Sequence, residues 1–130
     1  MKKSKALEKL SIQKMEIIGS IEKNIKNLIQ LGWKSRLIKI GYDDTLKELK
    51  KGIKGFLIIA EDLSKRTKRN ILYKYEGDFF EIFNKKEIGK MLGKKEVGII
   101  FVPENKYGLK LKKLIKDLYL IIGGNSSCQK

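Results

Sequence analysis

The 130-residue chain contains no histidine, and cysteine, tryptophan and proline each occur only once. Without histidine, an enzyme would lack the commonest general base and the commonest metal ligand of proteins. The single thiol, at Cys128, can form neither an intramolecular disulfide nor a thiolate metal site, which favours a reducing compartment. We therefore expect a cytoplasmic protein without a metal, and we do not expect an enzyme.

Long apolar runs are missing as well. The densest apolar runs are much shorter than the ~20 residues that a membrane-spanning helix needs. The amino terminus, MKKSKALEKL, lacks the apolar segment of a secretory signal. Neither the dinucleotide motif GxGxxG nor the phosphate loop GxxxxGK[ST] occurs. These absences leave no support for a membrane protein, an exported protein or a nucleotide cofactor.

Acidic residues are scarce: 15 Asp and Glu stand against 30 Lys and Arg, which gives a net charge of +15. At physiological salt such a field acts over about 8 Å, so the expected partner is a polyanion that touches the surface. Nucleic acid is the first interpretation and an anionic membrane the second. A charge that serves only to keep the protein soluble is the third interpretation.

The apolar pattern predicts one α/β domain in which helices alternate with short strands. The predicted strands span residues 37–40, 56–60, 79–83 and 97–102. The predicted later helices span about 43–51, 65–75, 85–93 and 111–122. Leu46 and Leu49 in the first of these helices, and Ile53 just after it, are predicted to face the core. Asn84 and Glu87 have the spacing of a reciprocal helix cap.

The chain divides into three predicted parts. Gly19 and Ser20 are predicted to break the amino-terminal third into two helices, with Ser20 capping the second. Residues 1–19 form a basic, helical extension, which is either a helix docked on the domain or a basic arm that becomes ordered on RNA. Its apolar side favours the docked helix. Residues 20–122 form the domain, and residues 123–130 form a flexible tail.

The stretch from Gly41 to Asp62 contains a glycine turn, a short basic helix, a glycine that ends it, and an apolar strand running into Ala60-Glu61-Asp62. This frame, together with IGKMLG at 88–93 and NLIQLG at 27–32, resembles the ribosomal L-seven-Ae family of kink-turn RNA binders. The spacing is most similar to the bacterial YlxQ-like branch, over roughly residues 23–118. The resemblance implies a three-layer α-β-α sandwich around a mixed four-stranded sheet.

The resemblance also implies a non-enzymatic protein that recognises structured, kink-turn-like RNA and works with ribosomal or other ribonucleoprotein (RNP) components. Lys39 and Gly41 match the basic-then-glycine entry of the family, and Lys47 matches its phosphate-contacting lysine. The family's Asn-Glu pair, which reads guanine edges, falls on Asp43 and Asp44. Asp44 keeps a carboxylate, whereas Asp43 lacks the amide donor.

The loop after the fourth predicted helix belongs to the same expected site. Family members often offer apolar side chains there, but only Val97 of this loop is apolar, which favours contact with the RNA backbone. Tyr42 stands beside the glycine turn and is expected either to stack on a base or to be partly buried. The expected RNA-binding residues are Lys39, Gly41, Tyr42, Asp43, Asp44, Lys47, Lys50, Gly93, Lys94, Lys95, Glu96 and Val97.

Two other interpretations stay open. The same fold could serve as a protein-interaction module, with the amphipathic segment from Leu7 to Ile18 docking a partner. A hydrolase could use the acid pairs Asp43-Asp44 and Glu61-Asp62, since two carboxylates can divide acid and base roles. Helix capping, the helix dipole or turn formation explains these acids more simply.

Overall fold

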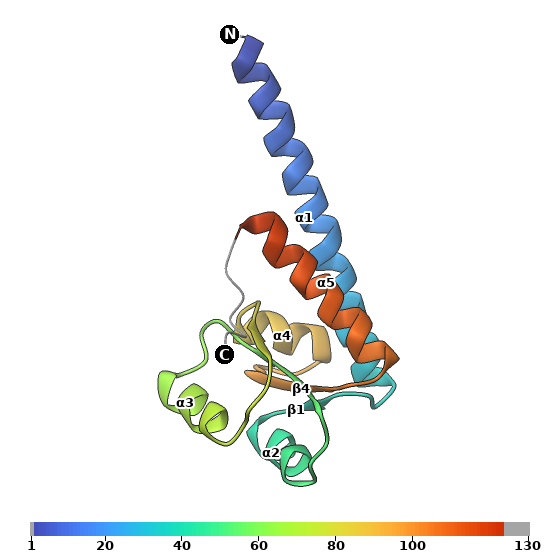
Figure 1. The fold of residues 1–130 in the computed structure, drawn as a ribbon, viewed down its shortest axis with the longest axis vertical. Coiled ribbons are helices and arrows are strands. Elements are labelled where there is room, and N and C mark those ends of the chain that lie inside the picture. Colours follow the sequence, from blue (N-terminus) through green and yellow to red (C-terminus); the bar gives the residue numbers. More distant parts are fainter. Residues whose placement is uncertain (1, 124–130) are drawn as a thin grey trace.

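The computed structural model describes residues 2–123, with side chains for residue 9 and for residues 11–123. The predicted tail, apart from Gly123, and Cys128 lie outside these residues. Helices and strands alternate as predicted (Figure 1). In chain order the elements are α1 (Lys2–Lys34), β1 (Lys39–Ile40), α2 (Tyr42–Lys50), β2 (Gly55–Ile59), α3 (Lys65–Tyr73), β3 (Phe79–Glu81), α4 (Lys85–Leu92), β4 (Ile99–Pro103) and α5 (Lys106–Ile122).

The four strands form one mixed sheet in the order β1-β4-β2-β3. β4 runs antiparallel to both of its neighbours, and β2 runs parallel to β3. The ends of β1 and β2 therefore lie at the same end of the sheet as the start of β4. The amide of Gly41, just after β1, donates a hydrogen bond to the Ile99 carbonyl at 2.8 Å, which joins this end of the sheet to the start of α2.

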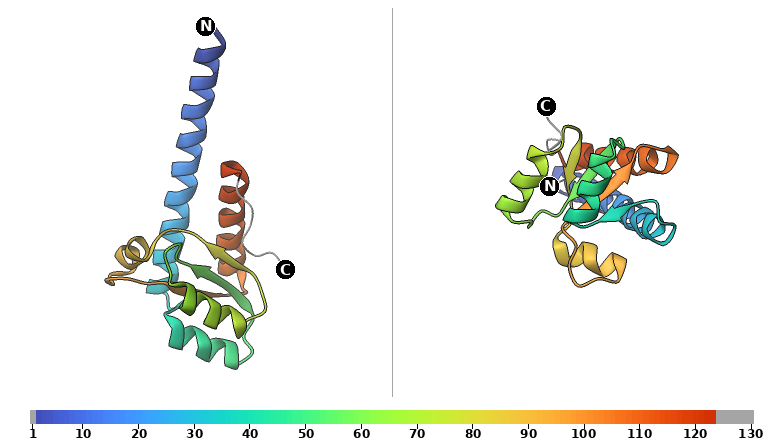
Figure 2. Two further views of the ribbon diagram at one scale, coloured as in Figure 1. Left: turned by 90° about the vertical axis from the view of Figure 1, so that its left-hand side faces the viewer. Right: turned by 90° about the horizontal axis from the view of Figure 1, so that it is seen from below.

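Helices cover both faces of the sheet, so the predicted three-layer α-β-α architecture is confirmed (Figure 2). Successive residues of a strand point to opposite faces. Phe56 and Ile58 of β2 join the core beneath α1, α4 and α5, whereas Leu57 and Ile59 join the smaller core beneath α2 and α3. The apolar run in β2 is thus buried on both sides, as expected for a central strand.

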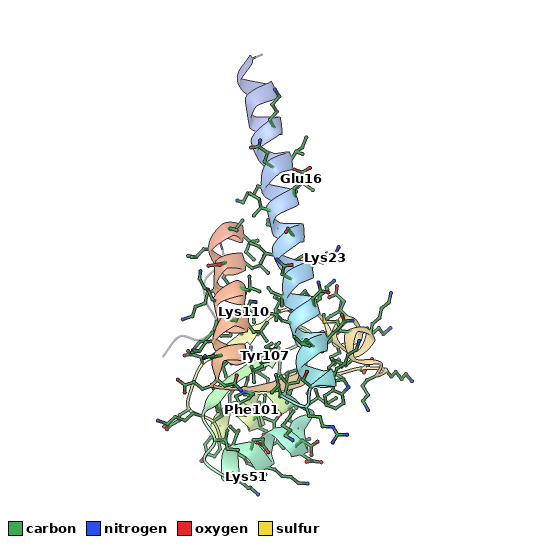
Figure 3. The ribbon with its side chains drawn as sticks, turned by 90° about the vertical axis from the view of Figure 1, so that its right-hand side faces the viewer. Glu16, Lys23, Lys51, Phe101, Tyr107 and Lys110 are labelled. Carbon is green, nitrogen blue, oxygen red and sulfur yellow. The ribbon has the colours of Figure 1, made fainter. Side chains whose placement is uncertain are left out.

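The predicted break at Gly19-Ser20 is wrong, because α1 is a single helix of 33 residues. A glycine inside a helix costs only about 1 kcal/mol relative to alanine, and no proline is present to end the helix. The prediction that the first half packs against the domain is also wrong: this half extends past the end of α5 (Figures 1 and 3). Met15, in the extending half, is 69% exposed.

The second half of α1 packs along α5. Ile25 and Ile29 of α1 are fully buried against Leu111 and Ile115 of α5. Near the base of this pair, the Tyr107 hydroxyl donates a hydrogen bond to the Leu28 carbonyl at 2.5 Å (Figure 3). α1 therefore has one half anchored in the core and one half outside it.

The inner side of α2 differs from the prediction. Thr45 is completely buried and Glu48 nearly so, whereas Leu46 is only half-buried and Ile53 is exposed. Leu49 is half-buried against the core of Leu57 and Ile59, as predicted, but hydrophobic spacing alone missed the buried polar residues of this short helix. The Thr45 hydroxyl has no hydrogen-bond partner among the described residues.

The helix ends follow the predicted signals more closely. The Ser64 hydroxyl accepts a hydrogen bond from the Thr67 amide at the start of α3. Asn84 and Glu87 form the predicted reciprocal cap of α4, with hydrogen bonds of 2.8 and 2.9 Å. α4 ends at Gly93, whose φ of 69° lies in the left-handed region that favours glycine.

Candidate nucleic-acid interface

The start of α2 forms the first part of the candidate site. Gly41 holds φ at 92° and ψ at 164°, which a side chain would disfavour, and directs the chain from β1 into the helix. No side chain caps α2. Asp43 and Asp44 instead lie exposed in its first turn, where the helix dipole favours negative charge.

Lysines surround this turn. Lys39 is exposed on the strand before it, and Lys47 and Lys50 are exposed on the following helix. Neither Lys47 nor Lys50 forms an ion pair with another described residue, whereas the neighbouring Lys51 lies 3.4 Å from a Glu48 carboxylate oxygen. The ammonium groups of Lys47 and Lys50 are therefore available to a phosphate.

The loop after α4 forms the second part of the candidate site. It leaves Gly93 in the left-handed conformation and exposes Lys94, Lys95 and Glu96. The main chain of this loop lies directly over Gly89, where a Cβ would come within 2.7 Å of the Lys95 carbonyl oxygen. The packing of the loop on α4 therefore fixes the positions of Lys94 and Lys95.

Val97 does not contribute an exposed side chain to this loop. It is only 6% exposed, it belongs to the core beneath α1, α4 and α5, and its amide bonds to the Lys85 carbonyl at 3.0 Å. Its inclusion among the expected RNA-binding residues is corrected in this respect: the side chain anchors the loop. An apolar residue just before a strand fits either burial in the core or contact with RNA. The sequence did not distinguish between these two roles.

The two parts meet at Trp33, near the end of α1. The Lys94 ammonium lies 5.7 Å from the centroid of the Trp33 ring, within the range of a cation–π contact. Trp33 also lines a surface hollow of about 420 Å³. The other lining residues are Arg36, Ile38, Lys39 and Asp44.

Sequence reasoning missed two residues of this hollow. Packing is the simplest explanation of a lone tryptophan, and Trp33 is indeed half-buried against the core, but it also lines the hollow together with Lys39 and Asp44. Arg36 adopts a left-handed conformation, with φ of 59°, in the turn between α1 and β1. Their proximity in sequence to Lys39 was the one signal that could have found them.

Tyr42 lies on the side of α2 that faces α3. It is half-buried against the core of Leu57, Ile59 and Ile71, and the Lys74 ammonium lies 5.9 Å from its ring centroid. Of the two expectations for Tyr42, this environment favours partial burial over stacking on a base.

The acid pairs considered for a hydrolase do not converge. Asp44 lines the hollow beside Trp33, whereas Glu61 lines another hollow, with Glu22, Glu81 and Glu87 among its walls. The Asp62 carboxylate accepts a hydrogen bond from the Lys85 amide at 2.8 Å, which caps the start of α4. Burial, and then the neighbouring carboxylates of Glu87, Glu81, Asp62 and Glu22, raise the pKa of Glu61. The hydrolase interpretation therefore has no geometric support.

Over the part of the chain that the structure describes, no helix combines the length and the apolar character needed to cross a membrane. α1 is long enough, but lysines and glutamates occur along it.

Residues 23–112 match the sequence model of the ribosomal protein L7Ae/L30e/S12e/Gadd45 family. A curated relative, the RNA-binding protein YlxQ of Enterococcus faecium, is 32% identical over 95 residues, which cover 69% of this chain and 89% of the relative. A protein of unknown function from Bacillus halodurans has a similar structure, with a TM-score of 0.64 and 25% identity over 71% of this chain and 96% of its own. The 15.5kD RNA binding protein of Giardia lamblia shares the fold, with a TM-score of 0.58 and 16% identity over 78% of this chain and 90% of its own.

Proposed function

The chain belongs to the ribosomal protein L7Ae/L30e/S12e/Gadd45 family, and we propose that it binds structured RNA through the start of α2 and the loop after α4. The relative from Enterococcus faecium is named as an RNA-binding protein, and its similarity extends over most of both chains. One observation carries the proposal: Trp33 joins the two basic segments, with Lys94 over its ring and Lys39 lining the same hollow.

The chemistry of this surface suits a sharply bent RNA. Phosphates crowd together where an RNA backbone kinks, and the lysines at 39, 47, 94 and 95 are exposed to pair with them. The Asp44 carboxylate, at the rim of the hollow, accepts hydrogen bonds from the amino edge of a guanine that is not in a Watson–Crick pair. We therefore propose a kink-turn as the recognised element.

This proposal makes the protein a binding component and not an enzyme. We expect it to act in the cytoplasm, within the ribosome or another RNP, where its RNA is folded and neighbouring proteins are present. The charge of +15 supports association with such a polyanion.

The test is a titration of the purified protein against a kink-turn RNA and a straight duplex of equal length at several salt concentrations. Tight binding to the bent RNA with a modest salt dependence is the expected result. Equal binding to both RNAs, lost as salt rises, would mean that the lysines contact phosphates without recognising shape, and kink-turn recognition would be rejected.

One observation favours a second function, the docking of a protein partner along the first half of α1. Ile12, Met15 and Ile17 are each at least half exposed on the half of α1 that extends past the end of α5 (Figure 1). Isolated helices of this length are marginally stable in water, so a partner that covers the apolar side chains would stabilise the segment.

This second function predicts that a defined ribosomal or RNP protein stays bound after nuclease treatment and at high salt. Met15→Glu together with Ile17→Glu should abolish that association and leave binding to the isolated RNA unchanged. If every associated protein is released by nuclease, the association runs through RNA and the docking function is rejected.

A further inference from the structure

We propose that the outer face of α3 is a second RNA-contacting surface, which holds an unpaired strand flanking the structured RNA. This α3 surface comprises Arg66, Arg69, Asn70 and Tyr73. The inference rests on the proposed RNA-binding function and adds to it a ligand class, single-stranded RNA, and a separate set of residues.

The exposed tyrosine is the first observation. Tyr73 is 88% exposed, more than any other exposed large apolar or aromatic side chain of the described residues. Its hydroxyl takes part in no hydrogen bond with another described residue. An exposed aromatic ring of this kind adds nothing to the stability of the core. Its face is available for stacking on a base.

The charges around Tyr73 are the second observation. From Ser64 to Tyr75 the chain carries five cations and no acid. Arg66, Arg69 and Tyr73 stand at i, i+3 and i+7, which places them on one face of the helix. Both arginines are exposed, and neither forms an ion pair with a described residue, in contrast to Lys68, which pairs with Glu81.

The position of α3 is the third observation. Leu63, just before α3, packs against Gly98, so the start of α3 lies beside the end of the segment that leads from Lys94 and Lys95 into β4. α2 and α3 also lie on the same face of the sheet, where Lys74 reaches the ring of Tyr42 (Figure 2). A strand that leaves the first site can therefore continue along α3 without crossing the sheet.

These observations select an unpaired strand as the ligand. Bases in a duplex stack on one another and are not available to a side chain, whereas a splayed base can stack on an exposed aromatic ring. Arginines on the same face as the ring can pair with the phosphates on either side of that base. Arg66 and Arg69 thus hold the backbone, and Tyr73 stacks on a base.

The experiment compares one kink-turn RNA with the same RNA extended by a single-stranded flank. The flank should tighten binding by wild-type protein about tenfold, the effect expected of one stacked base. Tyr73→Ala, and separately the double substitution of Arg66→Gln with Arg69→Gln, should lose this gain and keep the affinity for the RNA without the flank. Tyr73→Phe should keep the gain because its ring still stacks.

The matched control is Lys110→Gln with Lys116→Gln, which removes two exposed charges from α5, on the other face of the sheet (Figure 3). This control should keep the full gain. If the flank adds no affinity to the wild type, or if the α3 variants behave like the control, the α3 surface is rejected. The affinity of the wild type for the RNA without the flank tests the first site separately, so weak binding of that RNA counts against the proposed function. Failure of the wild type to bind either RNA overturns both proposals.

A second measurement locates the flank directly. A photoreactive thiouridine in the flank should crosslink to the tryptic peptide of residues 70–74, which contains Tyr73. Crosslinks found only in other peptides would overturn the assignment, including the case in which α3 serves a protein partner.

Discussion

Gly32 of α1 lies so close to Tyr107 of α5 that a Cβ on the glycine would overlap the tyrosine hydroxyl. The same hydroxyl donates its hydrogen bond to the Leu28 carbonyl, one turn earlier in α1. Burial raises the pKa of Tyr107 to about 12, so the hydroxyl keeps its proton throughout the physiological range. This contact fixes the end of α1, and with it Trp33, against the body of the domain.

Gly32→Ala is therefore expected to destabilise the protein by about 1–3 kcal/mol, because the added methyl group displaces the Tyr107 ring. Gly19→Ala is the matched control in the same helix, since a Cβ there meets no atom within 4 Å. It should stabilise the protein by up to about 1 kcal/mol through helix propensity. Urea denaturation of the two variants measures both effects. Equal effects of the same sign would contradict the close contact.

The same two glycines explain how far the sequence predicted the fold. The strand–helix alternation, the cap of α4 and the end of α4 at Gly93 were all predicted correctly, because each depends on residues close together in the chain. The predicted break at Gly19 is wrong, since a glycine weakens a helix without ending it. The need for glycine at position 32 depends on Tyr107, 75 positions later in the sequence, and no local pattern reveals it.

Lys47→Glu with Lys50→Glu is expected to weaken binding of kink-turn RNA at least about tenfold and to lower the salt dependence, because each lost phosphate contact releases one counterion fewer. Both side chains are exposed, so the fold should be retained. Filter binding at several salt concentrations measures the effect, and circular dichroism checks the fold. The charge-matched control is Lys110→Glu with Lys116→Glu on α5. An equal loss in both double variants would mean that net charge, and not the α2 surface, determines the affinity.

Asp43→Asn is expected to tighten kink-turn binding several-fold. Asp43 lies exposed in the first turn of α2, at the position where the resembled family has asparagine. The substitution removes a negative charge near the RNA phosphates and supplies an amide donor for a base edge. Glu104→Gln is the control, because it removes an equally exposed negative charge at the opposite end of the sheet. If both variants gain equally, the effect is long-range electrostatics and Asp43 does not contact the RNA.

The candidate site could be predicted from the sequence only in its contiguous parts. Residues from Lys39 to Lys50 follow one another, so one motif contained them all. Lys94 and Trp33 meet although 61 positions separate them, and only the packing of α4 beside α1 brings them together. The sequence also placed Val97 in the site because its exposure depends on which way the chain enters β4.

Glu61→Gln tests the electrostatics of the hollow that Glu61 lines together with Glu22, Glu81 and Glu87. Burial and these carboxylates raise the pKa of Glu61 above its ordinary value of 4.5, so the folded state binds this proton more tightly than the unfolded state does. The contribution of Glu61 to the free energy of unfolding should therefore decrease as pH rises from 4.5 through the raised pKa. At neutral pH the glutamine variant should be more stable by no more than about 0.5 kcal/mol, since only a minor part of Glu61 is buried and solvent screens its charge. The melting temperatures of both proteins, measured from pH 4 to 8, should converge at the acidic end of this range. A constant difference between them would show that lost contacts, and not the titration of Glu61, determine the stability of the variant.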